Sequence, residues 1–324
     1  MILAFVEHDR AKPNPLSLEA LTFGRRLAQR LGVPLHAALI GEVSLPLAGV
    51  LAAYGASAVN VIHHERLDEY APAAWAQGVV EAIDAVAPEA VLAAGSDRGN
   101  EVMAHVGAKT GLPMAANCVE VEPGEPYAVT RLRWGGSLLE EARLEGIPKL
   151  LTVAPHATLA EEVSAAGEPA VERLTPALED LDLRVRVTGR TEAAEGRVSL
   201  TEARVVVGGG RGVGSAEGFR QLEELAALLG GTVGVSRVVT SMGWRPHAEQ
   251  VGQTGTRIAP DLYIACGISG AIQHMVGCKA AKRILAINID PEAPMVAKAD
   301  YAVIGDLRTI VPALSAEISK SMRE

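Results

Sequence analysis

Residues 204–214, Arg-Val-Val-Val-Gly-Gly-Gly-Arg-Gly-Val-Gly, decide the fold of the second half of the chain. A short valine run predicts a buried strand, and the glycines after it predict a tight turn into a helix, which is expected at 216–229. A strand, a glycine loop and a helix begin a parallel βαβ series. Backbone N–H groups and the helix dipole at such a turn attract an anion, so the loop is a candidate phosphate site.

A full dinucleotide fingerprint is absent from this loop. No position starts the spacing G-x-G-x-x-G, because Val213 and Ser215 fall where the third glycine is required, and the next strand does not end in an acidic residue for a ribose. The glycines fit a phosphate site and a tight strand-to-helix crossover equally well. A standard NAD site is not expected.

The βαβ rhythm extends from this loop in both directions. Downstream, strands are expected at 232–235, 261–265, 284–289 and 302–304, with a last helix at 307–322. Upstream, strands are expected at 2–6, 35–40, 59–62 and 90–94, with helices at 17–31, 67–86 and 100–109. Gly32 and Gly111 should end two of these helices.

Two further segments complete the first half. Strand-like pieces between residues 118 and 153, around Pro123-Gly124 and Gly135-Gly136, predict antiparallel additions to its parallel sheet. A last strand is expected at 183–187, and a solvated linker at 191–196 could act as a hinge. The predicted class is α/β with two domains: an N-terminal nucleotide-binding-like α/β sheet domain, residues 1–195, and a C-terminal Rossmann-like parallel α/β domain, residues 196–324.

The composition excludes several classes of function. The chain has 324 residues, 48% of them hydrophobic, and a formal net charge of -9 without a basic stripe, so nucleic acid is not an expected partner. No apolar run approaches the ~20 residues that cross a bilayer, so the protein is expected to be cytoplasmic and not membrane-inserted. Three cysteines without a C-x-x-C pair argue against a disulfide framework or a metal site, and Cys266 is expected to be buried.

Residues 261–274, Asp-Leu-Tyr-Ile-Ala-Cys-Gly-Ile-Ser-Gly-Ala-Ile-Gln-His, form a second candidate site. They predict a buried strand, a glycine turn and a helix capped by Ser269. Such a helix start leaves free N–H groups facing an anion at the carboxyl end of a strand, where ligands bind in open α/β sheets. His274 lies among apolar residues, and a lone histidine in that setting is more often structural than functional.

Two weaker candidates lie between these segments. The loop 250–255, Gln-Val-Gly-Gln-Thr-Gly, combines glycines that permit close backbone approach with hydrogen-bonding side chains, but alone it fits a polar surface turn. The pair Ser236-Arg237 ends a predicted strand. A guanidinium there can stack on an aromatic ring system, although a single arginine is usually a surface cation.

Taken together and in this order, these segments resemble the α subunit of electron transfer flavoproteins. The similarity is strong over residues 202–312, where it rests on AxVVVGGGRGVGS, VGVSR, QVGQTG, DLYIACGISGAIQHMVGCK, AINIDPEAP and ADYAVIGDL, with ISGAIQH as the most specific motif. Over residues 1–155 it is looser and rests on AYGA, GSDRGNEVMAHVGAKTGLP and RWGG, where the family commonly has a Tyr before the glycine pair.

The resemblance implies one bound FAD and a set of residues that contact it. Arg237 would lie over the isoalloxazine face, the Thr254 hydroxyl would reach N5, and His274, as an imidazolium, would approach the C2 carbonyl and oppose negative charge there. Asn288 and Asp306 would serve the adenosine end. The implied FAD contacts are Arg211, Ser236, Arg237, Val251, Gly252, Gln253, Thr254, Ser269, Gly270, Ala271, Ile272, Gln273, His274, Asn288, Asp306 and Leu307.

The resemblance also implies an electron carrier rather than a catalyst. The N-terminal domain would dock a homologous electron transfer flavoprotein β subunit to form a heterodimer. The FAD would take electrons from acyl-CoA dehydrogenases or related flavoenzymes, as in fatty acid β-oxidation, and pass them to a membrane quinone oxidoreductase. In one departure, Thr240-Ser241 stand where the family usually has a segment with an acidic residue, and losing that charge would make the local field more positive.

Three alternatives stay open on the sequence. One is an NAD-dependent oxidoreductase, which the missing fingerprint opposes, and another is a nucleotide-binding sensor without redox chemistry. The third is a bifurcating family member that works with NADH through its partner subunit. No catalytic acid, base or nucleophile is assembled: the paired polar residues His8-Asp9, His63-His64 and Glu140-Glu141 are expected at strand ends or helix surfaces, in solvent.

Overall fold

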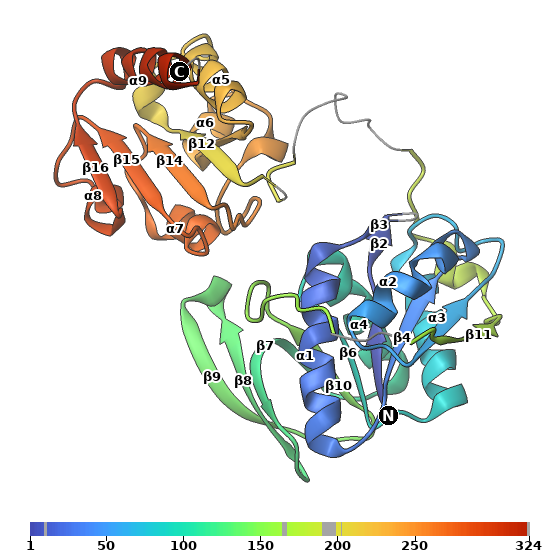
Figure 1. The fold of residues 1–324 in the computed structure, drawn as a ribbon. Helices are drawn as coiled ribbons and strands as arrows, with labels where there is room; N and C mark the ends of the chain where they lie inside the picture. The colour runs from blue at the N-terminus through green and yellow to red at the C-terminus, as the bar shows by residue number, and fades with distance from the viewer. Residues whose placement is uncertain (10–11, 164–166, 190–198, 202, 323–324) are drawn as a thin grey trace. The chain divides into compact units, whose positions relative to one another are not determined.

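The computed structural model describes residues 1–9, 12–163, 167–189, 199–201 and 203–322. The chain divides into two compact units, Met1–Arg190 and Thr191–Glu324. Each unit is an α/β sheet with helices on both faces (Figure 1), which confirms the predicted fold class. The predicted boundary after residue 195 and the predicted hinge at 191–196 lie outside the described residues.

The first unit contains one large sheet and a separate pair of short strands. Its strands are β1 (Ile2–Phe5), β2 (His8–Asp9), β3 (Lys12–Pro13), β4 (Leu35–Ile40), β5 (Ala58–Ile62), β6 (Ala90–Ala94), β7 (Met114–Glu122), β8 (Tyr127–Arg133), β9 (Leu138–Leu144), β10 (Lys149–Val153) and β11 (Ala170–Leu174). Its α-helices are α1 (Pro15–Leu31), α2 (Ala48–Ala53), α3 (Pro72–Val86) and α4 (Asp97–Thr110). Nine strands pair in the order β11-β5-β4-β1-β6-β10-β7-β8-β9, while β2 and β3 pair separately.

The predicted antiparallel additions are β8 and β9, which run antiparallel to their neighbours at one edge of the sheet (Figure 1). The two other strands of the same stretch, β7 and β10, are parallel members instead. After β9 the chain returns to the gap between β6 and β7, so β10 enters the sheet in the direction of both neighbours. The seven strands from β11 to β7 are therefore parallel, and their buried apolar faces require helices on both sides.

The ends of the helices follow from local chemistry. The Asn14 side chain accepts a hydrogen bond from the amide of Leu16 at the start of α1, where Pro15 supplies a helical φ without needing a partner for an N–H. Gly32 and Gly111 end α1 and α4 at φ 68 and 71, a region that glycine enters without strain, so both predicted ends are confirmed. Helices α1 and α2 contribute to one apolar core, and α3 and α4 to the other.

Three local predictions for this unit are wrong. Residues 183–187 form no strand; Asp180–Leu183 is a short 3-10 helix, and the last strand is the earlier β11. Helix α3 begins at Pro72 rather than at residue 67, because proline is favoured at the first position of a helix and disfavoured inside one. His8 is buried rather than solvated, and its ring stacks on Trp75 at 5.9 Å between centroids.

The second unit is a five-stranded parallel sheet. Its strands are β12 (Val205–Gly209), β13 (Thr232–Val235), β14 (Leu262–Cys266), β15 (Ile284–Asn288) and β16 (Tyr301–Ile304). Its α-helices are α5 (Phe219–Leu228), α6 (Arg237–Ser241), α7 (Ile272–Cys278), α8 (Pro294–Lys298) and α9 (Leu307–Ser321). The strand order is β13-β12-β14-β15-β16, so the order reverses between β12 and β14, and ligands of open α/β sheets bind at such a point.

The helices of this unit divide between the two faces of the sheet (Figure 1). Helices α5 and α9 bury their apolar sides on one face, and α7 and α8 pack on the other. All five strands are present within two residues of their predicted ends, which confirms them. The short helices α6 and α8 were not predicted, because five residues are too few to show a helical period.

A row of small residues crosses all five strands on the face that α7 and α8 cover. The strand register aligns Gly234 with Gly208, Gly208 with Ala265, Ala265 with Ala286, and Ala286 with Ala302. Residues in register on parallel strands point to the same face, so the row leaves room for larger side chains. Val251 lies against Gly234, and Tyr263 lies over Gly208.

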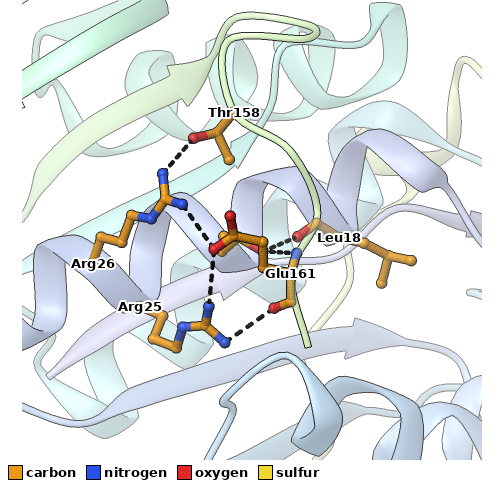
Figure 2. A network of polar contacts seen from close by, with 6 residues as sticks. Leu18, Arg25, Arg26, Thr158 and Glu161 are labelled. Carbon is orange, nitrogen blue, oxygen red and sulfur yellow. Dashed lines mark hydrogen bonds and ion pairs between the residues drawn. The ribbon is translucent and has the colours of Figure 1, made fainter. Parts of the chain in front are cut away.

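In the first unit, the segment after β10 is held against α1 by side chains of that helix (Figure 2). Arg26 donates to the Thr158 hydroxyl at 3.0 Å and to the Glu161 carboxylate at 2.8 Å. Arg25 donates to the Glu161 carbonyl at 3.0 Å. The buried Thr22 hydroxyl donates to a carbonyl one turn back and accepts the Glu161 N–H at 3.0 Å. Because exposed ion pairs stabilise little, the buried hydroxyl is the firmer attachment.

Thr22→Val removes this hydroxyl with little change of shape. The Glu161 N–H would lose its acceptor, at a cost of about 1 kcal/mol, and should exchange with solvent roughly fivefold faster. Hydrogen–deuterium exchange of peptides that contain Glu161 measures this. Thr110→Val removes a similar hydroxyl from α4 and should leave Glu161 unaffected. Equal Glu161 exchange in Thr22→Val and the wild type would contradict the attachment.

Candidate functional site

Five chain segments meet at the carboxyl edge of the second sheet. Each parallel strand delivers the residues that follow it to this same edge. The predicted site residues fall there strand by strand: Arg211 follows β12, Ser236 and Arg237 follow β13, Ser269–His274 follow β14, Asn288 ends β15, and Asp306 and Leu307 follow β16. The fold therefore brings together residues that lie up to 96 positions apart in the sequence.

The loops after β12 and β14 pass each other in direct backbone contact. The Gly210 amide donates to the Cys266 carbonyl at 2.9 Å, and the Gly212 amide donates to the Gly267 carbonyl at 3.1 Å. A Cβ on Gly210 or Gly212 would come closer than 3.0 Å to the Gly267 backbone, so neither position admits a larger residue without movement. The glycines are therefore needed for the tight crossover, which lies at the carboxyl edge of the sheet. The phosphate site at this loop stays a prediction.

The predicted loop 250–255 is seated between β13 and α7. The Val251 amide donates to the Val235 carbonyl at 2.8 Å, and the Gln253 amide donates to the Gln273 carbonyl at 2.8 Å. Close approach to α7 depends on Gly277, because a Cβ there would lie under 3.0 Å from the backbone of Gly252. The loop is therefore not a free surface turn; it is fixed on the segment that carries His274.

Ser269 does not cap a helix, which corrects the prediction. Helix α7 begins at Ile272 after Ala271, with no side-chain cap, because Gly270 at φ 83 turns the chain first and the Ser269 carbonyl accepts the Met295 amide at 3.0 Å. Within the described chain, the amides of residues 270–273 donate to no other group. Because no described group accepts from them, these N–H groups keep the capacity for an anion that the sequence indicated.

His274 is buried and makes a strong contact that the sequence did not suggest. Its Nε2 lies 2.8 Å from the hydroxyl of Tyr263, a fully buried residue of β14. Burial lowers the pKa of His274 from 6.5 to about 4, and the nearby Val251 backbone offsets only part of this shift. Burial therefore favours the neutral ring at neutral pH, in contrast to the imidazolium that was expected there.

The Thr254 hydroxyl is oriented by two side chains. Thr240 donates to the Gln250 side-chain oxygen at 2.7 Å, and the Gln250 amide donates to the Thr254 hydroxyl at 3.0 Å. Gln250 is almost fully buried, so its amide is held in place. Because Thr254 accepts from Gln250, its own proton is free to be donated elsewhere. Thr240, one of the two residues that replace the usual acidic segment, thus gains a positioning contact.

Ser236 and Arg237 differ in environment. Ser236 is buried, and its hydroxyl has no hydrogen-bond partner among the described residues. A buried hydroxyl without a partner costs stability unless a ligand satisfies it. Arg237 is exposed at the first position of α6 and makes no described ion pair, so its guanidinium is available to a ligand.

The remaining predicted residues line the same edge. The Asn288 side chain donates to the Ile268 carbonyl at 3.0 Å and accepts the Asp290 amide, so it braces the loop after β14. The Asp306 carboxylate caps α9 by accepting the Arg308 amide at 2.9 Å. Leu307 is buried, and Arg211 is exposed. The structure adds Tyr263 and Met295, whose roles depend on contacts between segments and had no sequence signal, and it gives Gln250 and Thr240 a positioning role.

These residues fit an extended anionic dinucleotide. Free amides and exposed arginines suit phosphate and carbonyl oxygens, while the unpartnered Ser236 hydroxyl is a buried polar atom that a ligand would satisfy. No group of three or more metal-ligating side chains lies within the described residues. Over the same residues, no helix combines the length and the apolar character needed to cross a membrane.

Each of the two units matches a family of known proteins. Residues 199–279 match the electron transfer flavoprotein FAD-binding domain, and residues 2–179 match the electron transfer flavoprotein domain. Among similar proteins, Protein FixB of Clostridium saccharobutylicum is 38% identical over 324 residues, 98% of this chain and 95% of that protein.

Two relatives named electron transfer flavoprotein subunit alpha are similar over nearly their whole length. The protein of Thermoanaerobacterium thermosaccharolyticum is 33% identical, and the alignment covers 98% of each chain. The protein of Mycobacterium tuberculosis strain H37Rv is 38% identical, again over 98% of each chain. The similarity thus covers both units and is not confined to the loops of the site.

His274→Gln tests the burial of a neutral ring. Because the pKa is lower in the folded chain, the unfolded chain binds the proton more readily, and stability that is present above about pH 6.5 is lost as the pH falls toward 4. The loss amounts to roughly 3 kcal/mol at most. We expect His274→Gln to flatten this part of a plot of unfolding free energy against pH, measured by urea titration. The control His247→Gln changes an exposed histidine and should give the same plot as the wild type. If His274→Gln also gave the wild-type plot, the ring would not be buried in its neutral form.

Proposed function

The chain belongs to the electron transfer flavoprotein family, and from that membership we propose that it is the α subunit of a heterodimeric electron carrier. Its second unit contains the family's FAD-binding domain, so the cofactor is FAD. Two of the relatives, aligned over 98% of this chain, are named electron transfer flavoprotein subunit alpha. The main support for the proposal is that the matched FAD-binding domain has free backbone amides and hydrogen-bond donors at the carboxyl edge of its sheet.

In the proposed site, different residues serve the two ends of FAD. Arg237, Thr254 and His274 would hold the isoalloxazine end, and Asn288 and Asp306 the adenosine end. The free amides of 270–273 and the exposed Arg211 would take the phosphates. Bound FAD supplies the capacity to accept and release electrons one at a time. The chain's own residues need only bind it, orient it and set the field around it.

The electrostatics support a role for Arg237 in setting that field. His274 is neutral, so the cation that the site offers to the isoalloxazine end is the exposed guanidinium of Arg237. Positive charge beside a group that gains negative charge favours its reduced form. The Thr254 hydroxyl adds a directed donor rather than a charge.

Partners complete the proposal. The first unit would dock the electron transfer flavoprotein β subunit, and the bound FAD would take electrons from acyl-CoA dehydrogenases or other flavoprotein donors and pass them to electron transfer flavoprotein-quinone oxidoreductase. We propose that the protein works in the cytoplasm, in fatty acid β-oxidation. We propose no substrate-converting site in this chain. A bifurcating role with NADH is the second candidate, because the residues that would decide it lie largely outside this chain.

Co-expression with the electron transfer flavoprotein β subunit tests the proposed function. We expect a yellow complex of two different chains that takes up electrons from a reduced acyl-CoA dehydrogenase. Reduction by NADH without such a donor would favour the bifurcating role. A colourless complex, or a chain that purifies alone and binds no flavin when FAD is added, would overturn the proposal.

Arg237→Ala should lower the reduction potential of the bound flavin. Removing one solvent-facing cation from an aromatic ring system is worth about 1 kcal/mol, or roughly 40 mV for a one-electron couple. A redox titration against a dye of known potential measures the shift. Arg204→Ala, which removes an exposed arginine before the start of β12 at the opposite edge of the sheet, is the matched control. An unchanged potential in Arg237→Ala would exclude stacking.

Thr254→Val should change the flavin's absorption spectrum while FAD stays bound. The substitution removes one directed hydrogen bond of about 1 kcal/mol, which is small beside the many other contacts of the cofactor. Equilibrium dialysis should show a loss of affinity of no more than about tenfold. The control Thr309→Val changes an exposed threonine of α9 and should give the spectrum and the FAD affinity of the wild type. Complete loss of FAD would show that Thr254 has another role.

A further inference from the structure

Tyr263 is a residue of β14, and its hydroxyl group is enclosed by neighbouring residues. Its side chain is completely buried, and the ring lies over Gly208 of the neighbouring strand. A Cβ at Gly208 would come well under 3.0 Å from the Tyr263 hydroxyl, so the small-residue row is what gives the phenol its room. The hydroxyl therefore has few positions open to it, and in the one it occupies it meets Nε2 of His274 at 2.8 Å.

Two arrangements of protons are compatible with this contact. If Tyr263 donates to Nε2, the neutral imidazole carries its proton on Nδ1. If Nε2–H donates to Tyr263, the phenolic proton needs a second acceptor, and the described residues provide none; the Nδ1 lone pair is then also left without a donor. The first arrangement leaves one buried group to satisfy and the second leaves two. Since each unsatisfied buried group is costly, the first is favoured.

The surroundings of Nδ1 point to the binding loop. Nδ1 is buried and makes no hydrogen bond of normal geometry with any described residue, while the backbone of Val251 in the loop 250–255 lies close enough to the ring to favour a proton on it. Val251 belongs to the proposed FAD contacts. A proton on Nδ1 would therefore be presented on the side of the ring away from Tyr263, toward the loop that is proposed to hold the cofactor.

We infer that Tyr263 is a positioning residue that locks His274 in the neutral tautomer with its proton on Nδ1. His274 then enters the site as a neutral hydrogen-bond donor of fixed direction. The lock follows from this chain alone, while its use toward FAD rests on the proposed function. Tyr263 acts only through His274 and does not itself reach the site.

The inference separates two duties within the site. A charged histidine would add to the field of Arg237, whereas a neutral donor adds direction without net charge. The carbonyl of a flavin's pyrimidine ring is an acceptor, so only the tautomer with a proton on the facing nitrogen can bond it. A free histidine exchanges between tautomers, and the site would then hold a donor only part of the time.

Nitrogen-15 NMR of the full chain, labelled at its eight histidines, tests the lock directly. The shifts of the two ring nitrogens distinguish a protonated from an unprotonated nitrogen, and the spectrum of His274→Gln assigns the His274 signals by difference. At about pH 7 we expect an unprotonated Nε2 and a protonated Nδ1, both with and without added FAD. A protonated Nε2 in the wild-type chain would overturn the inference without any variant.

Tyr263→Phe and Gly208→Ala probe the cause. The first removes the hydroxyl and keeps the ring; the second keeps both side chains and displaces the hydroxyl. In each, the ratio of the two tautomers should move toward equality by about tenfold, the size of one buried hydrogen bond. The matched control Tyr301→Phe removes an exposed hydroxyl from β16 and should leave the His274 signals in place. An unchanged ratio in Tyr263→Phe would refute the assigned role.

The outcomes distinguish this inference from the proposed function. A chain that binds no FAD but shows the expected tautomer would overturn the proposed function and leave the inference about Tyr263 standing. A chain that binds FAD with a protonated Nε2 would overturn the inference and leave the proposed function standing. If Tyr263→Phe does not fold, the wild-type spectrum and Gly208→Ala still decide the matter.

Discussion

The second unit depends on a steric constraint: a row of small residues across all five strands of its sheet. Gly234, Gly208, Ala265, Ala286 and Ala302 stand in register on one face near the carboxyl edge. Their small size lets other groups come close. Val251 packs against Gly234, and the Tyr263 hydroxyl lies over Gly208. If any of the central positions carried a branched side chain, the binding loop and α7 would be pushed away from the sheet.

That close packing also decides the electrostatic character of the site. A histidine on a loosely packed helix would stay solvated and ionisable, whereas here burial keeps His274 neutral. Charge is left to exposed arginines at the rim, and the buried groups contribute directed hydrogen bonds. Thr254 follows the same logic, because Gln250 occupies its acceptor side and Thr240 holds Gln250. The interior of the site is polar but uncharged.

Much of the fold was predictable from the sequence because strands buried on both faces are short continuous apolar runs. All five strands of the second sheet and the glycine ends of α1 and α4 follow from local patterns. The strand expected at 183–187 failed because a few alternating apolar residues also fit a 3-10 helix beside a loop. Antiparallel β8 and β9 were expected, but the insertion of β10 between β6 and β7 is a matter of topology that no local pattern records.

The candidate site was predictable as a set of segments, since every strand end of a parallel sheet meets the same edge. What failed were details that depend on contacts between segments. The cap expected at Ser269 is replaced by a turn at Gly270, which packs against Met295 from α8. The charge expected on His274 is opposed by the burial of its ring, which lies beside Tyr263, eleven residues earlier in the chain. Neither partner could be chosen from the sequence without knowing which strand lies beside which.

The three cysteines of the chain are all buried and unpaired, and the predicted burial of Cys266 is confirmed. Burial raises the pKa of each thiol to about 12. Thiols of that kind react slowly with maleimides and methanethiosulfonates, because the thiolate is the nucleophile. A cysteine introduced on the surface of each unit would therefore be labelled in preference to the native ones. Pairs of spin labels or fluorophores can then report distances between the two units without first rebuilding the core.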